Sequence, residues 1–166
     1  IEVLSTDFLK ISYRYLTKED LSFILEIEES SNPHPWSKRN FLDCLERGHY
    51  SLLQLVEGKP TGFAIQSVSL NEAHLLNIGI HLDYRRRGLG EDLLEQILYS
   101  SKTMGCSRIL LEARISNEVA ISLYRHKGFK KLAIKKGYYK LDKEREDAII
   151  MFKNLKYTWK NYFSED

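Results

Sequence analysis

A chain of 166 residues with 43% hydrophobic and 29% charged side chains has the composition of a folded, soluble protein, which excludes a disordered chain. The net charge of +2 makes no case for a nucleic-acid-binding protein, so no direct nucleic-acid role is expected. No apolar run approaches the ~18 residues of a membrane helix, and no signal-peptide pattern opens the chain. We therefore expect a cytoplasmic protein without membrane association.

The length suits a single domain, expected over residues 1–155, followed by an aromatic tail at 156–166. The two cysteines, Cys44 and Cys106, are expected to be free thiols in a reducing compartment, with Cys44 in the core. The five histidines lack the paired spacing of a metal site, so we predict no metal.

The first half of the chain predicts two helices, each begun by a capping residue. Thr17 can cap the first, with Asp20 at its third position. Ser37 can cap the second, which is expected to end at Gly48. Strands are expected at 11–17, on both sides of a turn at Glu57–Pro60 within 50–70, and at 74–82.

The second half predicts a helix at 91–101 and a nearly continuous apolar strand at 107–115, the pattern of a strand covered on both faces. Asn117 can cap a further helix that ends before Gly128. The apolar stripe of that helix is expected to hold Val119, Ala120, Leu123 and Tyr124. Two strands, near 129–134 and 147–155, close the chain. The strand–helix–strand–helix order in the middle predicts a mixed α/β fold with some parallel pairing.

The stretch "RRRGLG", Arg85–Gly90, lies between the strand at 74–82 and the helix that follows. Glycines there let the backbone approach a ligand, and the first amides of a helix favour an anion such as a diphosphate. Position 93 is Leu, so the dinucleotide fingerprint is not met. Glu91 and Asp92 in the first helical turn would repel phosphate, an effect the three arginines can offset. An ordinary charged loop remains the alternative.

Two long stretches, "NIGIHLDYRRRGLGEDLLEQIL" and "LLEARISNEVAISLYRHKGF", resemble the acetyl-CoA signature of the GNAT acetyltransferase superfamily. Its Arg-x-x-Gly-x-Gly form is met at Arg85–Gly90. Within that family, "HPWS" at 34–37, "SLYRHKGF" at 122–129, "YY" at 138–139 and "DAIIM" at 147–151 are similar to enzymes that acetylate the amino-terminal alanine of a small-subunit ribosomal protein. The similarity covers roughly residues 10–155.

The resemblance implies a fold and a cosubstrate. The fold is a mixed central sheet, splayed open between the parallel strands 74–82 and 107–115 and flanked by helices. The cosubstrate is acetyl-CoA, used without a metal. Its pantetheine arm would pair with the backbone of Ile78, Gly79 and Ile80 and contact Asn117. Its diphosphate would rest on the amides of Arg86, Arg87, Gly88, Leu89, Gly90 and Glu91.

The resemblance also implies Glu112 as the general base and Tyr124 as the general acid. A free α-amino group has a pKa near 7.7–8.0, so a carboxylate suffices as base. Burial of Glu112 should raise its pKa towards neutrality; a structural ion pair at a strand end is the alternative. For Tyr124 the alternative is core packing with one hydrogen bond. An acetylated Cys106 is a disfavoured rival mechanism, since it follows the helix at 91–101 rather than lying near Glu112.

Aromatic residues are candidates for the acceptor site. Tyr138 and Tyr139 could form one wall and Trp36 the opposite wall, although each could instead be a hydrophobic plug. The expected partner is the amino terminus of an acceptor protein, a ribosomal protein by resemblance, and the enzyme is expected to be a monomer or weak dimer. Alternatives are an enzyme for another terminus, a lysine or a small amine. A non-catalytic acyl-CoA-binding or ribosome-associated module is the alternative of another class.

Overall fold

The computed structural model describes residues 9–155, so the expected tail at 156–166 lies outside the described residues. Those residues contain no helix with the length and apolar character needed to cross a membrane. The chain divides into two compact units, the first made of Ile1–Ile65 and Asn77–Leu93 and the second of Gln66–Leu76 and Leu94–Asp166. The expectation of a single domain over 1–155 stays a prediction.

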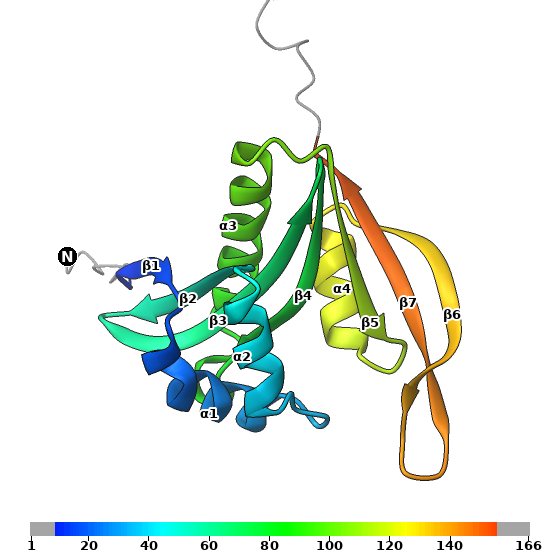
Figure 1. Cartoon of the computed structure of the whole chain (residues 1–166), viewed down its shortest axis with the longest axis horizontal. Coiled ribbons are helices and arrows are strands. Elements are labelled where there is room, and N and C mark those ends of the chain that lie inside the picture. The colour runs from blue at the N-terminus through cyan, green and yellow to red at the C-terminus, as the bar shows by residue number, and fades with distance from the viewer. Residues whose placement is uncertain (1–8, 156–166) are drawn as a thin grey trace, which may run out of the picture. The chain divides into compact units, whose positions relative to one another are not determined.

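Strands and helices alternate along the chain (Figure 1). The strands are β1 (Ile11–Tyr15), β2 (Tyr50–Val56), β3 (Lys59–Ser69), β4 (Glu72–Ile80), β5 (Arg108–Arg114), β6 (Lys130–Lys140) and β7 (Arg145–Asn154). The helices are α1 (Leu21–Ser31), α2 (Lys38–Glu46), α3 (Leu89–Thr103) and α4 (Glu118–His126), with 3-10 turns η1 (Lys18–Asp20) and η2 (Leu82–Tyr84). The strand order is β1-β2-β3-β4-β5-β7-β6.

The middle of the sheet holds the parallel pair that the sequence predicts. The ladder between β4 and β5 runs from Glu72–Arg108 to Leu75–Leu111 and covers four residue pairs. Both strands continue past its end, β4 to Ile80 and β5 to Arg114. The remaining ladders around β5, β6 and β7 are antiparallel, which confirms a mixed sheet.

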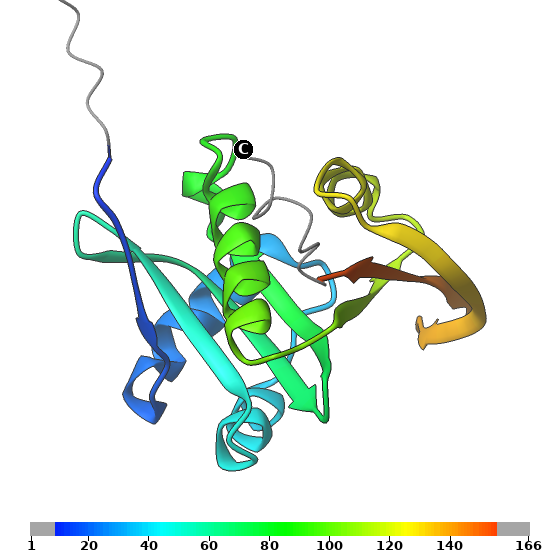
Figure 2. The same cartoon turned by 90° about the horizontal axis from the view of Figure 1, so that it is seen from above.

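In the first unit, apolar residues of the helices pack on the strands. Figures 1 and 2 show α1 and α2 next to each other beside β2 and β3. Phe41 of α2 meets Phe63 of β3 edge to face, with ring centroids 5.3 Å apart, and both are fully buried. Edge-to-face pairs of this kind stabilise a core beyond the area that they bury. Cys44 lies in the same core as expected.

In the first unit the predicted cap at Ser37 is present, whereas Thr17 precedes the 3-10 turn η1 and its side chain accepts no capping hydrogen bond. The Ser37 hydroxyl accepts a hydrogen bond from the Asn40 amide at 3.3 Å, and α2 ends before Gly48, whose φ is +70°. The Thr17 amide donates to the Asp20 carboxylate at 2.9 Å, at the start of the 3-10 turn that leads into α1. Each of these contacts is local, which is why the sequence could predict it.

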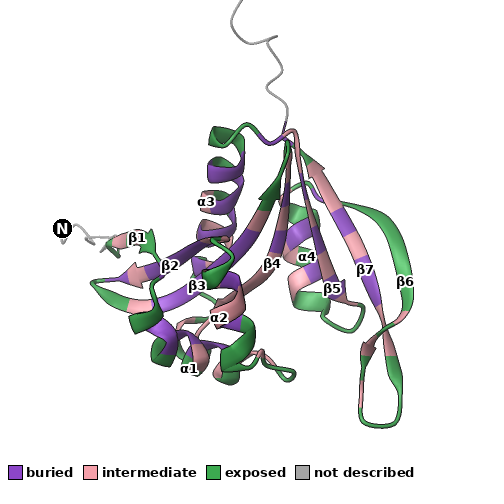
Figure 3. Cartoon of the chain, viewed as in Figure 1, coloured by how far each residue is buried: buried purple, intermediate pink, exposed green. Residues whose placement is uncertain are grey.

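In the second unit, β5 pairs with β7 over seven residue pairs, and β6 pairs with the other side of β7. Figure 1 shows the turn of the β6–β7 hairpin projecting beyond α4. Figure 3 shows β6 exposed over most of its length. Lysines are frequent on this edge strand, and charged side chains on an edge discourage pairing with another chain.

Helix α3 begins at Leu89, two residues earlier than predicted, so Gly90 lies inside the helix. Leu89 is 2% exposed, and its carbonyl accepts a hydrogen bond from the side-chain amide of the buried Gln54 at 2.9 Å. Burial of Leu89 favours the helical conformation at a position where the glycine-rich sequence predicted a loop. Part of the predicted loop at 83–90 is instead the 3-10 turn η2.

Two expectations about buried faces were wrong. Strand β5 is not covered equally on both faces: Ile109, Leu111 and Ala113 are buried, while the alternating residues are intermediate. A strand residue and its neighbour point to opposite faces, so Glu112 lies on the more open face. On α4, Val119 is 84% exposed, and Ile121 is buried with Tyr124 instead. The i and i+3 spacing of Ile121 and Tyr124 defines the buried face.

Candidate active site

Glu112, the predicted base, belongs to a polar cluster in the second unit. Its Oε1 atom accepts a hydrogen bond from Nζ of Lys135 at 2.9 Å. The Tyr138 hydroxyl also favours the ionised form of the Glu112 carboxylate and so lowers its pKa. The ring of Tyr138 in turn lies 4.8 Å from the Lys135 ammonium, within the range of a cation–π contact. We call Glu112, Lys135 and Tyr138 the Glu112 cluster.

The pKa of Glu112 differs from expectation. Burial raises it, but the hydrogen bonds from Lys135 and Tyr138 and the charge of Lys135 lower it more, so that it lies below its ordinary value. The predicted rise towards neutrality is therefore wrong. A cation within hydrogen-bonding distance favours the ionised carboxylate more strongly than partial burial disfavours it.

An irregular stretch of β6 places the two tyrosines. Lys135 pairs with Ala148 and Tyr139 pairs with Glu146, so four steps along β6 match two steps along β7. Gly137 lies within this bulge at φ +58°, a conformation that glycine adopts without strain. Its amide donates to the Asp147 carboxylate at 2.8 Å. The bulge breaks the strict alternation of the strand.

Tyr139 contacts a second ion pair, formed by Arg114 and Glu146. The guanidinium of Arg114 lies 4.2 Å from the Tyr139 ring centroid and 3.1 Å from the Glu146 carboxylate. Glu146 also accepts a hydrogen bond from the Ser116 amide at 2.9 Å. Burial, followed by the charge of Glu112, raises the pKa of Tyr139 to about 12. The Tyr139 ring is therefore neutral and fixed against a cation.

Tyr124, the predicted acid, is 7% exposed on α4. Its ring lies 5.7 Å from the ring of Phe129. Burial, and to a smaller extent the charge of Tyr139, raises the pKa of Tyr124 to about 12. The Tyr124 hydroxyl therefore holds its proton throughout the physiological range, as an acid must before it donates.

Asn117 has a structural function that the sequence predicted. Its Oδ1 atom accepts a hydrogen bond from the Ala120 amide at 3.3 Å and caps α4. The residue is exposed at the end of the loop after β5. Its backbone is also engaged, because the amide donates to the Arg114 carbonyl at 2.9 Å and the carbonyl accepts from the Ile121 amide at 3.1 Å. A role of Asn117 in binding the pantetheine arm stays a prediction.

The glycine loop in the first unit has an unusual backbone. Arg86 has φ +61° and Gly88 has φ +77°, both in the left-handed region. A side chain added at Gly88 would meet nothing within 4 Å, so the loop has open space in front of it. The first hydrogen bond of α3 joins the Asp92 amide to the Gly88 carbonyl at 3.0 Å. The start of a helix is a position at which proteins commonly bind anions, through backbone amides that precede such a bond.

The three arginines of this loop differ in their contacts. Arg85 donates to the Ser31 carbonyl at 2.7 Å and so stabilises the carboxyl end of α1. Arg87 donates to the Asp83 carbonyl at 3.3 Å and lies 5.4 Å from the Tyr84 ring. Arg86 and Arg87 are exposed, which leaves their charge available to an anion at the loop.

Asp92, one of the two acidic residues expected to repel a phosphate, is hydrogen-bonded by a neighbouring strand. The Tyr13 hydroxyl of β1 donates a hydrogen bond to the Asp92 carboxylate. The side-chain amide of Gln54 donates both to the Tyr13 hydroxyl at 3.0 Å and to the Leu89 carbonyl at 2.9 Å. Gln54 is fully buried, so these contacts hold the start of α3 against β1 and β2. The Asp92 carboxylate is thereby hydrogen-bonded to Tyr13.

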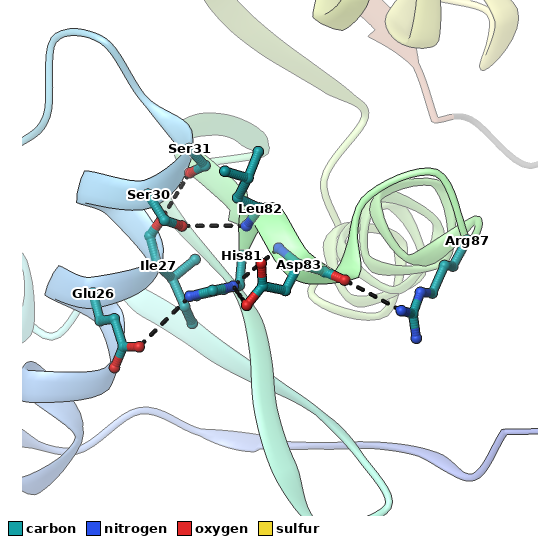
Figure 4. Close-up of polar contacts among 8 residues, drawn as sticks. All are labelled: Glu26, Ile27, Ser30, Ser31, His81, Leu82, Asp83 and Arg87. Carbon is teal, nitrogen blue, oxygen red and sulfur yellow. Dashed lines mark hydrogen bonds and ion pairs between the residues drawn. The ribbon is translucent and has the colours of Figure 1, made fainter.

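The segment between β4 and the loop is anchored to α1. Figure 4 shows Ser30 and His81 at the centre of these contacts. The Ser30 hydroxyl accepts from the Leu82 amide at 3.2 Å. His81 accepts from the Asp83 amide through Nδ1 at 3.1 Å, and its Nε2 lies 3.6 Å from the Glu26 carboxylate. These contacts fix the approach to the glycine loop.

The predicted pantetheine strand, Ile78, Gly79 and Ile80, forms the end of β4 and is half-buried. A side chain at Gly79 would meet the Phe63 ring at 3.0 Å and the Ser31 hydroxyl at 3.6 Å. The close approach of the Phe63 ring therefore favours glycine at this position. At Gly62 an added Cβ would lie 2.9 Å from the Gly79 carbonyl oxygen.

Trp36 is held by a buried carboxylate. Glu28, 1% exposed, accepts hydrogen bonds from the Trp36 amide at 3.1 Å and from the Asn32 side chain at 2.7 Å through Oε1. Its Oε2 accepts a hydrogen bond from the side-chain amide of Asn77 in β4 at 3.1 Å. The Trp36 ring is half-buried, 5.3 Å from Phe41. Part of this ring thus packs against the core, and part faces solvent.

Several of these residues were not predicted as site residues. The sequence patterns did not single out Lys135, Arg114, Glu146, Glu28 or Gln54. Their partners are distant in sequence, so no local pattern could have found them. The thiol of Cys106 is buried and its pKa is raised by that burial, which argues against a nucleophile. Among residues 9–155, no group of His, Cys, Asp or Glu side chains could hold a metal.

Two groups of predicted site residues thus form, one in each unit. The second unit brings Glu112 close to Tyr138, with Tyr139 and Tyr124 adjoining. The first unit holds Arg86–Glu91 at the start of α3, together with the end of β4 and the Trp36 loop. The open space at Gly88 and the exposed arginines fit a diphosphate.

Comparison with known proteins identifies the family of the chain. The sequence pattern of the acetyltransferase (GNAT) family matches residues 18–129. The ribosomal protein bS18-alanine N-acetyltransferase of Escherichia coli K12 is 38% identical over 136 residues, which cover 82% of this chain and 92% of the relative.

Solved structures agree with these matches. The crystal structure of the ribosomal-protein-S18-alanine N-acetyltransferase from Escherichia coli has a TM-score of 0.83 at 34% identity, and the match covers 93% of this chain and 99% of that one. The yncA protein of Salmonella typhimurium, solved with its cofactor acetyl-CoA, shares the fold at a TM-score of 0.72 and 20% identity, over 88% and 94% of the two chains. The expected fold class is confirmed. The chain therefore belongs to the GNAT acetyltransferase family, and it is an acyltransferase.

Proposed function

We propose that the enzyme transfers the acetyl group of acetyl-CoA to the amino-terminal α-amino group of a protein, the terminal alanine of a small-subunit ribosomal protein in the cytoplasm. Relatives that bear this activity in their names are 38% identical over most of the chain. The observation that carries the proposal is the ionised Glu112 carboxylate, which already holds a primary ammonium group beside two tyrosines.

Acetyl-CoA, when bound, would supply an acetyl thioester as the activated group. The diphosphate is assigned to the amides and cations of Arg86, Arg87, Gly88, Leu89, Gly90 and Glu91. The left-handed backbone at Arg86 and Gly88 turns successive amides in this loop, and the start of α3 adds its partial positive charge. The pantetheine arm is assigned to the backbone of Ile78, Gly79 and Ile80 in the first unit and to Asn117 in the second.

Glu112 is assigned as the group that orients the acceptor amine and accepts its proton. The lowered pKa keeps the carboxylate ionised at neutral pH, which suits binding of an α-ammonium. A free α-amino group has a pKa near 7.7–8.0, so a useful neutral fraction exists before any base acts. The carboxylate therefore has a modest task, and accepting a proton directly or through water is sufficient.

Tyr124 is assigned as the general acid that protonates the departing thiolate. Its hydroxyl is neutral and buried, which keeps the proton in place until sulfur becomes basic. Tyr138, exposed by 46%, and Tyr139 are assigned to the acceptor's first residues. Trp36 of the first unit is assigned to acceptor binding on the strength of its partly exposed ring.

The proposal is tested with three peptides that differ in their amines. One begins with a free alanine and contains no lysine, the second is the same peptide with an acetylated terminus, and the third has an acetylated terminus and an internal lysine. We expect mass spectrometry to find one added acetyl group on the first peptide alone, with matching release of CoA. Acetylation of the third peptide without the first would assign the enzyme to lysine. No product from any peptide, despite CoA binding, would favour a non-catalytic acyl-CoA-binding module.

A further inference from the structure

The contacts of Lys135 go beyond an ordinary surface ion pair, and the inference drawn from them rests on the proposed function. Nζ of Lys135 lies 2.9 Å from Oε1 of Glu112 and 4.8 Å from the ring centroid of Tyr138. A primary ammonium thus donates a charged hydrogen bond to a carboxylate on one side and contacts an aromatic ring on another. These are the two contacts by which proteins recognise ammonium groups.

We propose that Glu112 and Tyr138 form a binding subsite for a primary ammonium group, and that Lys135 occupies this subsite until the acceptor's α-ammonium displaces it. The ε-ammonium of lysine and the α-ammonium of a peptide carry the same charge and the same three donors. A carboxylate and ring that accommodate one of them accommodate the other.

The exposure of the two charged side chains agrees with an exchange of occupants. The Lys135 side chain is 47% exposed, and its flexible stem lets the ammonium move into water. The Glu112 side chain is only 18% exposed, so its charge is partly removed from water. Departure of Lys135 without replacement would leave that carboxylate poorly solvated, whereas an incoming ammonium restores the lost contact. Displacement and acceptor binding are therefore coupled.

The neighbouring ion pair shows the contrast. Arg114 and Glu146 have side chains 19% and 13% exposed, and Glu146 is held further by the Ser116 amide. The planar guanidinium of Arg114 is also stacked on Tyr139. Arg114 is thus enclosed on several sides, whereas Lys135 has an open path to solvent. Of these two pairs, the Glu112–Lys135 pair is the one able to exchange its cation.

The exchange has a consequence for the product. Acetylation converts the terminal ammonium into a neutral amide, which cannot replace the charge of Lys135 at Glu112. Lys135 then returns to the carboxylate and the product leaves. The subsite therefore discriminates between a free and an acetylated terminus, through the charge that the reaction itself removes.

The first test compares Lys135→Gln with Lys136→Gln, an adjacent exposed lysine with the same loss of charge. If Lys135 competes with the acceptor, then its removal lowers the KM for an alanine-first peptide by about three- to tenfold, as expected when a competing state of 70–90% occupancy is lost. Lys136→Gln is expected to leave the KM unchanged. A KM that is unchanged or raised by Lys135→Gln, relative to Lys136→Gln, overturns the proposal.

The second test does not depend on turnover. The lysines are dimethylated with ¹³C-formaldehyde, which retains their charge, and the Lys135 signal is identified by its loss in Lys135→Gln. Addition of the free alanine-first peptide is expected to shift that signal and to lower the Lys135 pKa towards its ordinary value. The acetylated peptide is expected to do neither, and Glu112→Gln is expected to abolish the response.

The two proposals fail in distinguishable ways. A Lys135 signal that responds to the free peptide, in an enzyme that acetylates no peptide, would retain the ammonium subsite and refute the proposed acetyl transfer. Efficient acetylation with an unresponsive Lys135 signal would refute the subsite and leave the proposed function standing.

Discussion

Tyr138 and Tyr139 are adjacent in sequence, but their rings meet edge to face at 85° with centroids 5.0 Å apart, and each has its own partners. Tyr138 contacts Glu112 and Lys135, whereas Tyr139 lies against Arg114. Consecutive residues of a regular strand point to opposite faces of the sheet. The two rings can contact each other because the bulge that contains Gly137 breaks this alternation. The predictions about catalysis concern the groups that these tyrosines surround.

Replacing Glu112 with Gln keeps the size of the side chain and removes its charge. We expect kcat to fall by about 10²–10⁴-fold, the usual cost of losing a general base, because glutamine cannot accept the proton. Calorimetry is expected to show unchanged CoA affinity. Glu144→Gln, which removes the same charge from the β6–β7 turn, is the control and should retain the wild-type rate. Full turnover by Glu112→Gln would show that the base is elsewhere.

The pH dependence of kcat/KM follows from the lowered pKa of Glu112. A carboxyl group with a lowered pKa stays ionised as pH falls until that lowered value is reached, so it causes no loss of rate between pH 6 and 8. The acid limb is instead expected to follow the acceptor amine, with a midpoint near 7.7–8.0. We expect the limb to move with the pKa of the acceptor when peptides of different terminal residues are compared. If the midpoint of the acid limb is the same for all acceptors, the limb reports the titration of a group on the enzyme.

Replacing Tyr124 with Phe removes the proposed acid and little else. The pKa of about 12 keeps the Tyr124 proton in place below that pH, so no alkaline limb from this residue is expected up to about pH 10. We expect kcat to fall by about 10²-fold or more in Tyr124→Phe, with melting temperature nearly unchanged. Tyr99→Phe, on the exposed face of α3, is the control. Equal rates in the two variants would leave Tyr124 a packing residue.

Replacing Gly88 with Ala tests the diphosphate site. Its φ of +77° strains any other residue by about 1–2 kcal/mol, and the strain reorients the amides of the loop. We expect CoA affinity, measured by calorimetry, to fall by about tenfold or more. Gly48→Ala is a matched control, because Gly48 has φ +70° and equally open surroundings in the turn after α2. Equal CoA affinity in the two variants would contradict the assignment.

Asp20 is expected to contribute to stability in a pH-dependent way. Its carboxylate accepts hydrogen bonds from both terminal guanidinium nitrogens of Arg14, at 2.7 and 2.8 Å, and from the Thr17 amide at 2.9 Å. The hydrogen bond from Arg14 outweighs burial and lowers the Asp20 pKa. Because Arg14 is 47% exposed and screened by water, we expect Asp20→Asn to lower the free energy of unfolding by only about 1–2 kcal/mol at pH 7.

The sign of this effect sets its pH window. A lowered pKa in the folded state stabilises the protein above the unfolded value near 3.9, and the contribution is lost as pH falls through the folded value. The difference between wild type and Asp20→Asn in urea denaturation should therefore shrink below about pH 4. Asp142→Asn, an exposed residue in the β6–β7 turn, should show no comparable difference at pH 7. A gap that is constant from pH 7 to 3 would contradict the ionic origin.

Local features of the fold could be predicted because their causes are local. The caps at Ser37 and Asn117 join residues three positions apart, and the turn at Gly58 depends on a positive φ of +78°. The start of α3 could not be placed, because burial of Leu89 and its bond from Gln54 depend on a contact 35 residues away. The exposed face of α4, with Val119, likewise depends on what the helix packs against.

The chemistry of the site depends on longer-range contacts. The resemblance to the family nominates Glu112 and Tyr124 as candidate base and acid. It does not reveal that Glu112 is ionised rather than nearly neutral, because its partner Lys135 lies 23 residues later on β6, across the intervening strand β7. The register of β6 and its bulge bring that ammonium to the carboxylate. Local sequence therefore specifies which groups are present, whereas strand pairing determines their charge, because electrostatic energy depends on distance in space and not along the chain.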